Sequence, residues 1–569
     1  MRTIRIGNCS GFYGDRFSAM AEMLDGGPLD YLTGDYLAEL TMLILGRDRQ
    51  KDPSLGYAKT FLRQLGDCLA LARDRRVRIV TNAGGLNPAG LAQAVRALAA
   101  ERGVDVAVAH VQGDDLIGRA GEHGWRGALT ANAYLGAFGI AEALTSGADI
   151  VVTGRVTDAS LTLGPAIAEF GWGRTDFDRL AAGVVAGHIL ECGTQATGGN
   201  FAGFATVDTS RPLGFPLAEL SADGTAVVTK HPGTGGAVTV DTVTAQLVYE
   251  VGAPHYANPD VTARLDTVEL EQAGPDRVRI TSVRGVAPPP ATKIALNSSG
   301  GWRNSVEFVL TGLDIEEKAA WVRKQMTEAL SARPPAEIVW DLARTDHADP
   351  ATESAASAVL RCHVKDPDPA VVGRAFSSAA VELALASYPG FHVTAPPGAG
   401  APFGVYRAAY LPQELVPHVV VRPDGTEVDI AAPQVTAELP EETAPLAVVA
   451  CSDRTTELPL GRLVFARSGD KGGTANVGVW IPAGHPRRSD AFAWLHTWLT
   501  PDVVSRLLPE SAGRSIDVFA LPNLCAVNIV IDGLLGEGVA SSTRFDPQAK
   551  AVGEWLRARV VNLPEEFLE

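Results

Sequence analysis

The sequence predicts an α/β fold with a Rossmann-like parallel sheet in its N-terminal part, a middle β-rich α+β region and a separate C-terminal α+β unit. Up to about residue 200, short apolar runs alternate with helical patterns, which is typical of a parallel sheet with helices on both faces. Beyond that point, β-branched segments are separated by Gly, Pro and Asp turns. From about residue 457, strands and helices form a second, shorter series.

The first part, residues 1–200, is expected to be doubly wound. RIVT at residues 78–81 and DIVVTG at 149–154 are almost wholly apolar, as strands buried on both faces of a sheet are. The expected strands are TIRIGN, DYLTG, VRIVTNAGG, VDVAVAHV and ADIVVTGRV, and the expected helices are RFSAMAEML, AELTMLILGRD, YAKTFLRQLGDCLALARDRR, AGLAQAVRALAAERG and ANAYLGAFGIAEALTSG.

The middle part, residues 201–448, continues this region with β-rich α+β structure. NFAGFATVDTS, TAVVTKHPGTGGAVTVDTVTAQLVYEV and DRVRITSVRGV indicate antiparallel strands. Helices are expected in DIEEKAAWVRKQMTEAL and VVGRAFSSAAVELALASY, and strands in EIVWDLART and AASAVLRCHVKD. Residues 394–445 are rich in proline and are predicted to be a surface excursion that leads to a linker.

The last part, residues 457–569, is predicted to be an independent unit of antiparallel strands with helices on one face. GRLVFARSGDKGGTANVGVWIP indicates a strand, a glycine loop and a strand, and RSIDVFALPNLCAVNIVIDGLL indicates two further strands. AFAWLHTWLTPDVVSRLLP and DPQAKAVGEWLRARVV indicate helices.

The composition argues against two classes of partner. The formal net charge is −17 and the chain has no run of Lys or Arg, so neither nucleic acid nor an anionic membrane is expected to bind. Six scattered cysteines without a CxxC pair, and an N-terminus without an apolar signal segment, predict a cytoplasmic protein. A large apolar chain of this kind is also expected to form a homo-oligomer.

The first loop, RIGNCSGFYGDR at residues 5–16, holds three glycines between a strand and a helix. Their spacing is looser than the dinucleotide fingerprint G-x-G-x-x-G, although Asp30 or Asp35 could serve as the ribose-binding acid. None of the tyrosines has a lysine four residues later, so the catalytic pair of short-chain dehydrogenases is missing. The alternative is a strand-to-helix turn that needs glycine for its own backbone.

Small polar and charged residues, Glu39 among them, follow the predicted strands, at the edge where open parallel sheets bind ligands. The N–H groups of Gly84 and Gly85 suit an oxyanion, Arg155 suits a carboxylate or phosphate, and Asp158 suits proton transfer. The alternative is that Asp158 caps the next helix and pairs with Arg155. The candidate acid/base groups here are Asp15, Asp35 and Asp158, and the candidate binding residues are Ser10, Gly11, Asn82, Gly84, Gly85, Asn87 and Arg155.

A second group of candidates lies in GHILECGTQATGG and TKHPGTGG. His188, Glu191 and Cys192 fall on one helical face, so His188 and Cys192 could form a nucleophilic pair or half of a metal site. The alternative is a helix end with a buried thiol. Lys230 is predicted to reach a substrate from the second of these loops.

The loop ARSGDKGGTANVG, residues 466–478, concentrates charge among three glycines. We expect a seven-residue turn whose backbone N–H groups and Lys471 bind an anion, with Asp470 as an acid or base. The alternative is a solvated hairpin tip. The candidate binding residues of this loop are Arg467, Lys471, Gly472 and Asn476.

Several long segments together resemble the acyclic terpene utilisation (AtuA-like) family. They are GNCSGFYGDR, GGPLDYLTGDYLAELTMLI, KDPSLGYAKTFL, TNAGGLNP, TGRVTDASL, GHILECGTQATGGNF, TKHPGTGGAVTVDTVTAQLVYE and ARSGDKGGTANVGVW. The resemblance covers essentially the whole chain. It implies a large N-terminal domain, a C-terminal ferredoxin-like domain, and a place in catabolism of citronellol- and geraniol-type terpenoids beside acyl-CoA carboxylases, dehydrogenases and hydratases.

Three functions follow from these observations. The first is an enzyme of terpenoid or branched-chain acyl-CoA or carboxylic-acid metabolism, a hydro-lyase, isomerase or carbon–carbon lyase that uses aspartates and no redox cofactor. The second is an NAD(P)-dependent oxidoreductase, and the third is a non-catalytic acyl-CoA-binding or assembly component. Coenzyme A as part of an anionic substrate and a divalent metal among the aspartates both stay open.

Overall fold

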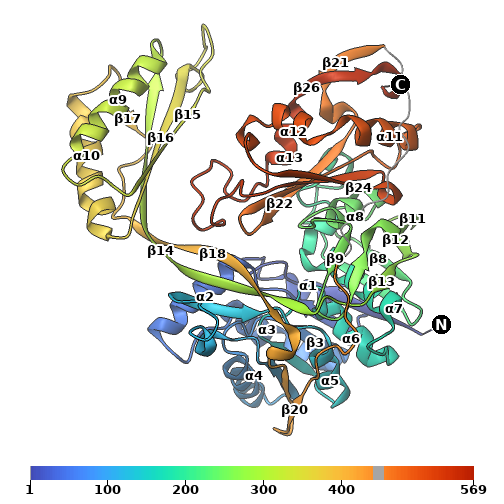
Figure 1. Ribbon diagram of the computed structural model, residues 1–569. Helices are drawn as coiled ribbons and strands as arrows, with labels where there is room; N and C mark the ends of the chain where they lie inside the picture. The colour runs from blue at the N-terminus through green and yellow to red at the C-terminus, as the bar shows by residue number, and fades with distance from the viewer. Residues whose placement is uncertain (1, 440–453, 569) are drawn as a thin grey trace. The chain divides into compact units, whose positions relative to one another are not determined.

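The computed structural model describes residues 2–439 and 454–568, which form two compact units (Figure 1). Among the described residues, unit 2 comprises Ser298–Val405 and Ala540–Phe545, and unit 1 comprises the rest. The predicted linker, which begins near residue 445, lies mostly outside the described residues.

The centre of unit 1 is the predicted parallel sheet. Five parallel strands stand in the order β1, β2, β3, β6, β4, so the chain returns to place β6 between β3 and β4. Their bounds are Thr3–Asn8 (β1), Tyr31–Gly34 (β2), Arg78–Thr81 (β3), Ile150–Thr153 (β6) and Val108–Gln112 (β4). β3 and β6 are buried on both faces, as their apolar sequences predict.

Helices cover both faces of this sheet, which confirms the doubly wound prediction. Leu32, Ile79 and Val152 pack with α1, α3 and α4 on one face, whereas Val80 and Val151 pack with α5, α6 and α7 on the other. Alternate residues of one strand therefore face two different cores. The bounds are Ala19–Asp25 (α1), Glu39–Lys51 (α2), Lys59–Arg75 (α3), Pro88–Arg102 (α4), Phe138–Thr145 (α5), Ser160–Phe170 (α6) and Phe177–Glu191 (α7).

Antiparallel strands from the middle region extend the sheet at both edges. β7 (Pro216–Ser221), β8 (Ala226–Lys230), β12 (Arg277–Thr281) and β11 (Glu269–Gly274) follow one another outward from β1. β19 (Val419–Val421) and β20 (Glu427–Asp429) lie beyond β4. A small sheet is formed by β9 (His255–Ala257), β10 (Thr262–Arg264) and β13 (Arg284–Val286).

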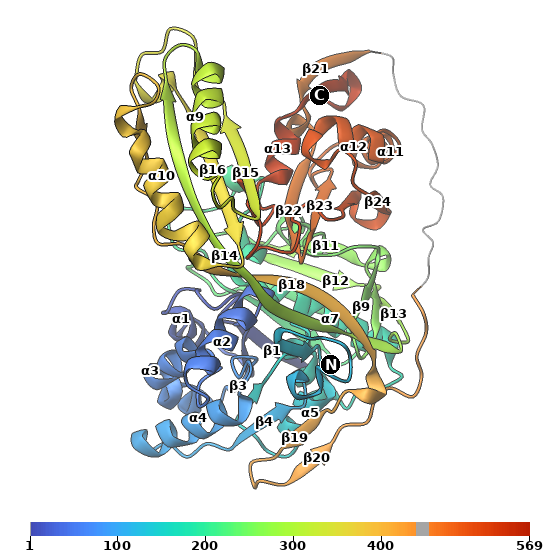
Figure 2. The same ribbon diagram turned by 60° about the vertical axis from the view of Figure 1, so that its left-hand side comes forward.

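The C-terminal domain, which is part of unit 1, is the expected antiparallel sheet with helices on one face. Figure 2 shows α11, α12 and α13 gathered beside β22, β23 and β24. The strand order is β22–β23–β25–β24. The opposite face of this sheet packs on α8 (Val240–Leu247) of the middle region. The other bounds are Phe465–Lys471 (β22), Thr474–Trp480 (β23), Ile516–Leu521 (β24), Ala526–Ile531 (β25), Arg488–Trp498 (α11), Pro501–Leu507 (α12) and Val552–Ala558 (α13), with β21 (Thr455–Pro459) paired to β26 (Val560–Pro564).

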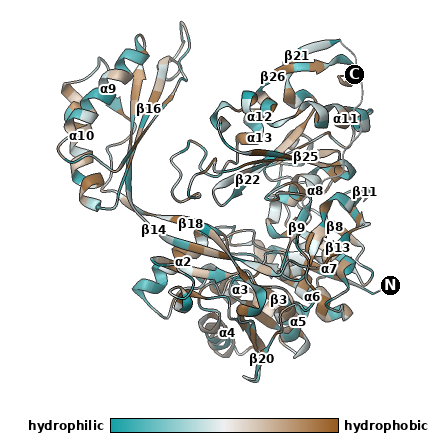
Figure 3. Ribbon diagram, in the orientation of Figure 1, coloured by the Kyte–Doolittle hydropathy of each residue, from teal (hydrophilic) through white to brown (hydrophobic). Residues whose placement is uncertain are grey.

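Unit 2 has its own sheet, with α9 (Ile315–Ala329) and α10 (Phe376–Glu382) packed on one face. Its strands are β15 (Glu337–Ala343), β16 (Ser357–Asp366), β14 (Ala291–Thr311) and β17 (His392–Val393), and β18 (Ala401–Pro412) pairs with β14. β14 and β18 each run from one unit into the other (Figures 1 and 2). The hydropathy colouring of Figure 3 shows brown, hydrophobic strands within the sheets and teal turns around them.

Four local predictions are wrong. NFAGFATVDTS, residues 200–210, holds the short 3-10 turn Phe204–Thr206 and no strand. ANAYLGAFGIAEALTSG is not wholly helical, because α5 is preceded by the strand β5 (Ala128–Ala133), which pairs with β14. VDTVTAQL forms the helix α8 rather than a strand, since Thr239 and Thr242 form a reciprocal cap at its start. The proline-rich stretch 394–445 is more than a surface excursion, because its described part, up to residue 439, supplies β18, β19 and β20.

Candidate functional site

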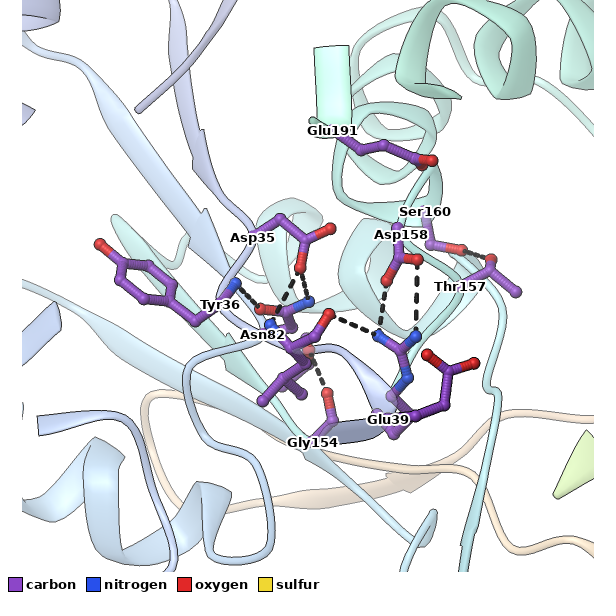
Figure 4. A network of polar contacts seen from close by, with 12 residues as sticks. Asp35, Tyr36, Glu39, Asn82, Gly154, Thr157, Asp158, Ser160 and Glu191 are labelled. Atoms are coloured by element: carbon purple, nitrogen blue, oxygen red, sulfur yellow. Dashed lines mark hydrogen bonds and ion pairs between the residues drawn. The ribbon is translucent and has the colours of Figure 1, made fainter. Parts of the chain in front are cut away.

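The carboxyl ends of the parallel strands bring the predicted loops together at one edge of the sheet, as Figure 4 shows. Asn82, after β3, donates its Nδ2 hydrogen to Asp35 Oδ1 over 2.6 Å and accepts the Tyr36 N–H on its own Oδ1 over 2.7 Å. Asp35 Oδ1 also accepts the Leu37 N–H over 3.1 Å. Asp35 is thus held rigidly at the end of β2 by its neighbours.

Arg155 and Asp158 follow β6 and form a buried ion pair, with 2.5 Å between Nη1 and Oδ1. Arg155 is 2% exposed, and its guanidinium lies 4.3 Å from the ring centroid of Tyr134. Burial disfavours its charge, but Asp158 and other nearby acids outweigh burial and raise its pKa. α6 begins at Ser160 with Ala159 as its N-cap, so Asp158 pairs with Arg155 and does not cap the helix by a side-chain bond.

Asp35 and Glu191 lie beside this pair as buried carboxyl groups. Burial, and then the negative charge of Asp158, raise the pKa of both well above the ordinary value, which favours their protonated forms. In Figure 4 the carboxyl group of Glu191 points toward the same region as Asp158. The site therefore holds proton donors close to a fixed cation.

His188 pairs with Glu191 and not with Cys192. Its Nδ1 lies 3.0 Å from Glu191 Oε1, and burial followed by the charge of Lys471 lowers the pKa of His188 to about 4. His188 Nε2 and Glu191 Oε2 are buried and find no hydrogen-bond partner among the described residues. Unpaired buried polar atoms cost free energy, so a pair of them in one cluster indicates a place where a polar ligand binds.

Two lysines that are far apart in the sequence supply positive charge. Lys293 on β14 lies 3.5 Å from Glu39 Oε1, and its ammonium stands over the rings of Tyr134 and Tyr406. Burial would raise the pKa of Glu39, but Lys293, Arg155 and Lys471 lower it to about 2, so Glu39 stays ionised. Within the described residues, Lys471 forms no ion pair, and its charge acts on Glu39, His188 and Glu191.

Asp470 comes to the same cluster from the C-terminal domain. Its Oδ1 lies 3.5 Å from Lys550 Nζ. Burial and then the negative charge of Glu250 raise the pKa of Asp470 to about 6, against the opposing charge of Lys550. A carboxyl group with this pKa can both accept and release a proton near neutral pH.

The glycine turn that carries these residues is shorter than predicted. Arg467, Asp470 and Lys471 lie within β22, which pairs residue by residue with β23, and only Gly472 and Gly473 form the turn. Gly472 has a positive φ of 64°, the conformation that a two-residue hairpin requires. The expected seven-residue anion-binding turn is wrong, because the hairpin pairing uses most of its backbone.

The glycine loop after β1 is held by hydrogen bonds among its own residues. Asp15 accepts the N–H groups of Gly11 and Arg16 over 2.9 and 2.8 Å, and Ser10 Oγ donates to the Phe12 carbonyl. A Cβ on Gly11 would stand 2.7 Å from the carbonyl carbon of Cys192, so this glycine permits the loop after β1 to approach the end of α7 closely. These contacts leave Asp15, Ser10 and Gly11 in a structural arrangement rather than beside a phosphate.

Several other predicted residues are held by structural contacts. Asn87 caps α4 through the Gly90 N–H, and the Gly85 N–H is taken up by the Asn82 carbonyl. A Cβ on Gly84 would stand 2.4 Å from the Thr153 oxygen. Lys230 binds Asp276, 3.2 Å away, and the Thr234 carbonyl.

The remaining candidates contribute to the contact between the C-terminal domain and the rest of unit 1. Arg467 donates to Gln195 Oε1 and lies over the ring of Tyr249. Asn476 accepts the Glu250 N–H over 2.7 Å. Burial, followed by the charges of Glu250 and Glu191, raises the pKa of Cys192 well above the ordinary value, so the thiol is not ionised at neutral pH.

Sequence reasoning missed Lys293, Glu250, Tyr134 and Tyr406, and it noted Glu39 and Glu191 without choosing them. Both of these glutamates had a signal in the sequence. Glu39 follows a predicted strand, and Glu191 falls on the same helical face as His188. Lys293 and Glu250 carried none, since they come from elements that only the tertiary fold brings to this edge.

No group of three or more His, Cys, Asp or Glu side chains in residues 2–439 and 454–568 is arranged to hold a metal ion. In the same part of the chain, no helix has the length and apolar character to cross a membrane.

The comparisons with known proteins identify a family and give no individual relative. Neither the curated proteins nor the solved structures contain a match to this chain. The model of the acyclic terpene utilisation family protein AtuA matches residues 4–422, and the model of the AtuA ferredoxin-like domain matches residues 458–562. The first match spans every strand of the parallel sheet, and the second coincides with the four-stranded C-terminal sheet and its helices. The chain therefore belongs to the acyclic terpene utilisation family and carries the ferredoxin-like domain of that family at its C-terminal end.

Proposed function

We propose that this protein is an enzyme of acyclic terpenoid catabolism that adds, removes or shifts groups on an anionic, branched substrate by proton transfer. The substrate class is a carboxylate or its coenzyme A thioester, and the reaction is of the hydro-lyase, isomerase or carbon–carbon lyase type. The observation that carries the proposal is the cluster in which the buried carboxyl groups of Asp35 and Glu191, whose pKa values are raised, lie near the cations Arg155 and Lys293 and the exposed Lys471.

The cations suit the negative group of the substrate. Arg155 and Lys293 are already paired with Asp158 and Glu39, whereas Lys471 forms no ion pair within the described residues. An unpaired ammonium group is the best placed of the three to bind a carboxylate or an enolate. We therefore assign substrate binding to Lys471, with Arg155 and Lys293 as fixed charges around it.

The carboxyl groups suit acid–base chemistry without a redox cofactor. In a dehydration, the Asp470 carboxylate takes a proton from carbon, and Asp35 or Glu191 gives its proton to the hydroxyl group, which leaves as water. Asp470 then releases its proton to solvent, and Asp35 or Glu191 takes one up from solvent, so protons balance over one turnover. Neither transfer calls for a nicotinamide, and the glycine loop after β1 supports this because its backbone donors are bound to Asp15.

The test is a substrate screen on the full-length protein and two variants. Branched unsaturated acids, their hydroxy acids and the corresponding coenzyme A thioesters are screened by thermal shift, and hits are followed by mass spectrometry for gain or loss of water or for isomerisation. Asp470→Asn should lower kcat by about 10²–10⁴-fold with little effect on KM. Lys471→Gln should weaken binding of the anion by about tenfold or more.

Matched controls separate these effects from general damage. Asp517→Asn, an exposed carboxyl on β24 of the same domain, and Lys324→Gln, an exposed lysine on α9, should leave both constants unchanged. The proposal is wrong if the wild-type protein converts a nicotinamide cofactor with these substrates. It is equally wrong if both cluster variants keep full activity on a substrate that the protein converts.

A further inference from the structure

Glu250 has a backbone conformation that glutamate disfavours. It stands three residues beyond the end of α8 with a φ of 56°, in the left-handed region. Only glycine, and to a lesser degree asparagine and aspartate, enters this region at low cost. A fold that needed only the turn would be better served by glycine, so a glutamate here points to a use for its side chain.

The C-terminal domain holds this turn with two buried asparagines. Asn476 on β23 accepts the Glu250 N–H over 2.7 Å, and Asn528 on β25 donates its Nδ2 hydrogens to the carbonyls of Val251 and Gly252 over 2.8 and 2.6 Å. The two amides also bond to one another. Asn476, predicted as a substrate-binding residue, thus binds the backbone of Glu250.

Two glycines, one on β22 and one on β23, let these strands approach the end of α8. A Cβ on Gly469 of β22 would stand 2.2 Å from the Tyr249 ring, and one on Gly478 of β23 would stand 2.1 Å from Val248 Cγ2. Residues 248–252 are therefore seated in a cradle made by three strands of the ferredoxin-like domain. The cradle fixes where the Glu250 side chain begins.

The carboxylate of Glu250 reaches the candidate site. Its negative charge acts on His188, Glu191 and Cys192 at the end of α7, on Tyr256 of β9, on Tyr249, and on Asp470 of β22. Lys550, which lies before α13, is 3.5 Å from Asp470 and also bonds to the hydroxyl of Tyr249, whose side chain is hydrogen-bonded to Glu250. Among the described residues no Lys, Arg or His forms an ion pair with Glu250, so a structural salt bridge does not account for it.

We propose that Glu250 is an acid/base residue of this site and that Asn476 and Asn528 are positioning residues that hold it there. The Glu250 carboxylate accepts the proton that Asp470 has taken from the substrate and releases it to solvent, so that both carboxylates are restored for the next turnover. No oxidant or reductant is consumed. The reaction part of this inference rests on the proposed function, whereas the placement of Glu250 does not.

Two substitutions at Glu250 separate a chemical role from a structural one. Glu250→Gln should lower kcat by about 10²–10⁴-fold while KM changes little. Glu250→Gly should abolish turnover to the same extent and shift Tm upward, because glycine relieves the left-handed backbone. A Glu250→Gly protein that gains stability and keeps its turnover would overturn the inference.

The positioning role is tested with a matched amide. Asn523, which follows β24, also bridges from the C-terminal domain, donating to the carbonyls of Leu265 and Val268 over 2.8 Å each. Asn476→Ala and Asn523→Ala should both lower Tm, but only Asn476→Ala should lower kcat, by tenfold or more, and move the pH profile. Equal kinetics in the two variants would remove the positioning role.

A further readout does not depend on turnover. Carbon-13 NMR of aspartate carboxyls, with Asp470 assigned by its loss in Asp470→Asn, should show a lower titration midpoint for Asp470 in Glu250→Gln, because a neighbouring negative charge is gone. An unchanged midpoint would show that Glu250 does not face Asp470. If the wild-type protein converts none of the screened acids and thioesters, the proposed function fails, and the NMR and Tm results still decide the placement of Glu250.

Discussion

Glu39 and Glu191 carry the same side chain and lie in the same cluster, yet the structure moves their pKa values in opposite directions. Burial raises both, but Lys293, 3.5 Å from Glu39, together with Arg155, brings the pKa of Glu39 down to about 2. Glu191 has Asp158 and Glu250 as its strongest charged neighbours, and its pKa rises. Different charged neighbours thus make Glu39 a permanent anion and Glu191 a proton donor.

At the residue scale we also predict that Cys192 is not a nucleophile. Its thiol is kept neutral by burial and by Glu250, and His188 is engaged with Glu191. Cys192→Ala should therefore retain at least half of the wild-type turnover, and iodoacetamide at pH 7.5 should not inactivate the protein. Mass spectrometry of the alkylated protein checks the second point, and modification of Cys192 with loss of activity would contradict the prediction.

At the scale of elements, the contact between β22, β23 and α8 depends on two glycines. Gly469→Ala and Gly478→Ala each place a methyl group within 2.2 Å of Tyr249 or Val248, so the sheet must move away from α8. We expect each variant to lose about 1–3 kcal/mol of unfolding free energy and most of its turnover. Denaturant unfolding and steady-state kinetics measure the two effects.

Gly484→Ala provides the control for this prediction. Gly484 follows β23 in the same domain and has no atom within 4 Å of an added Cβ. Its replacement should leave stability and kinetics unchanged or slightly improve stability. Unchanged turnover in Gly469→Ala and Gly478→Ala would show that the site does not depend on this seating of α8.

The sequence predicts the parts of the site that follow local rules. Asp35, Asn82 and Arg155 follow apolar strands, and parallel strands place such residues at a common edge. α8 was predicted as a strand because its β-branched residues favour strands, and the reciprocal Thr239–Thr242 cap prevailed over that preference. Lys293 and Glu250 could not be found, since their positions depend on the pairing of β14 and on the cradle of the C-terminal domain.

At the scale of the whole molecule, buried titratable groups make stability depend on pH in a particular direction. Burial raises the pKa of Asp114 to about 7 and, with Asp158 nearby, raises those of Asp35 and Glu191 well above the ordinary value. Below its raised pKa each of these carboxyls is protonated in the folded protein, whereas in the unfolded chain it stays ionised down to about pH 4. The folded state then binds more protons, so stability rises as pH falls from about 7 toward 4.

Buried histidines oppose this trend below pH 6.5. Burial lowers the pKa of His188 to about 4 and that of His418 to about 3, so both stay neutral in the folded protein while the unfolded chain becomes protonated. The unfolded state then binds the extra protons, and stability contributed by these groups is lost as pH falls from 6.5 toward 4. Below pH 6.5 these opposing slopes make the dependence of Tm on pH flatter than the carboxyls alone would give.

Asp35→Asn tests this balance because asparagine resembles the protonated acid. Its Oδ1 can still accept the hydrogens of Asn82 and Leu37, but the group no longer titrates. Each carboxyl protonated only in the folded state contributes about 1.4 kcal/mol per pH unit to the slope, so the variant should show a smaller gain in stability as pH falls from about 7 toward 4. Its stability at pH 8 should exceed that of the wild type, whereas the two proteins should converge near pH 4. Thermal and urea unfolding at several pH values measure both quantities, and an identical slope in the variant would mean that Asp35 is ionised in the folded protein.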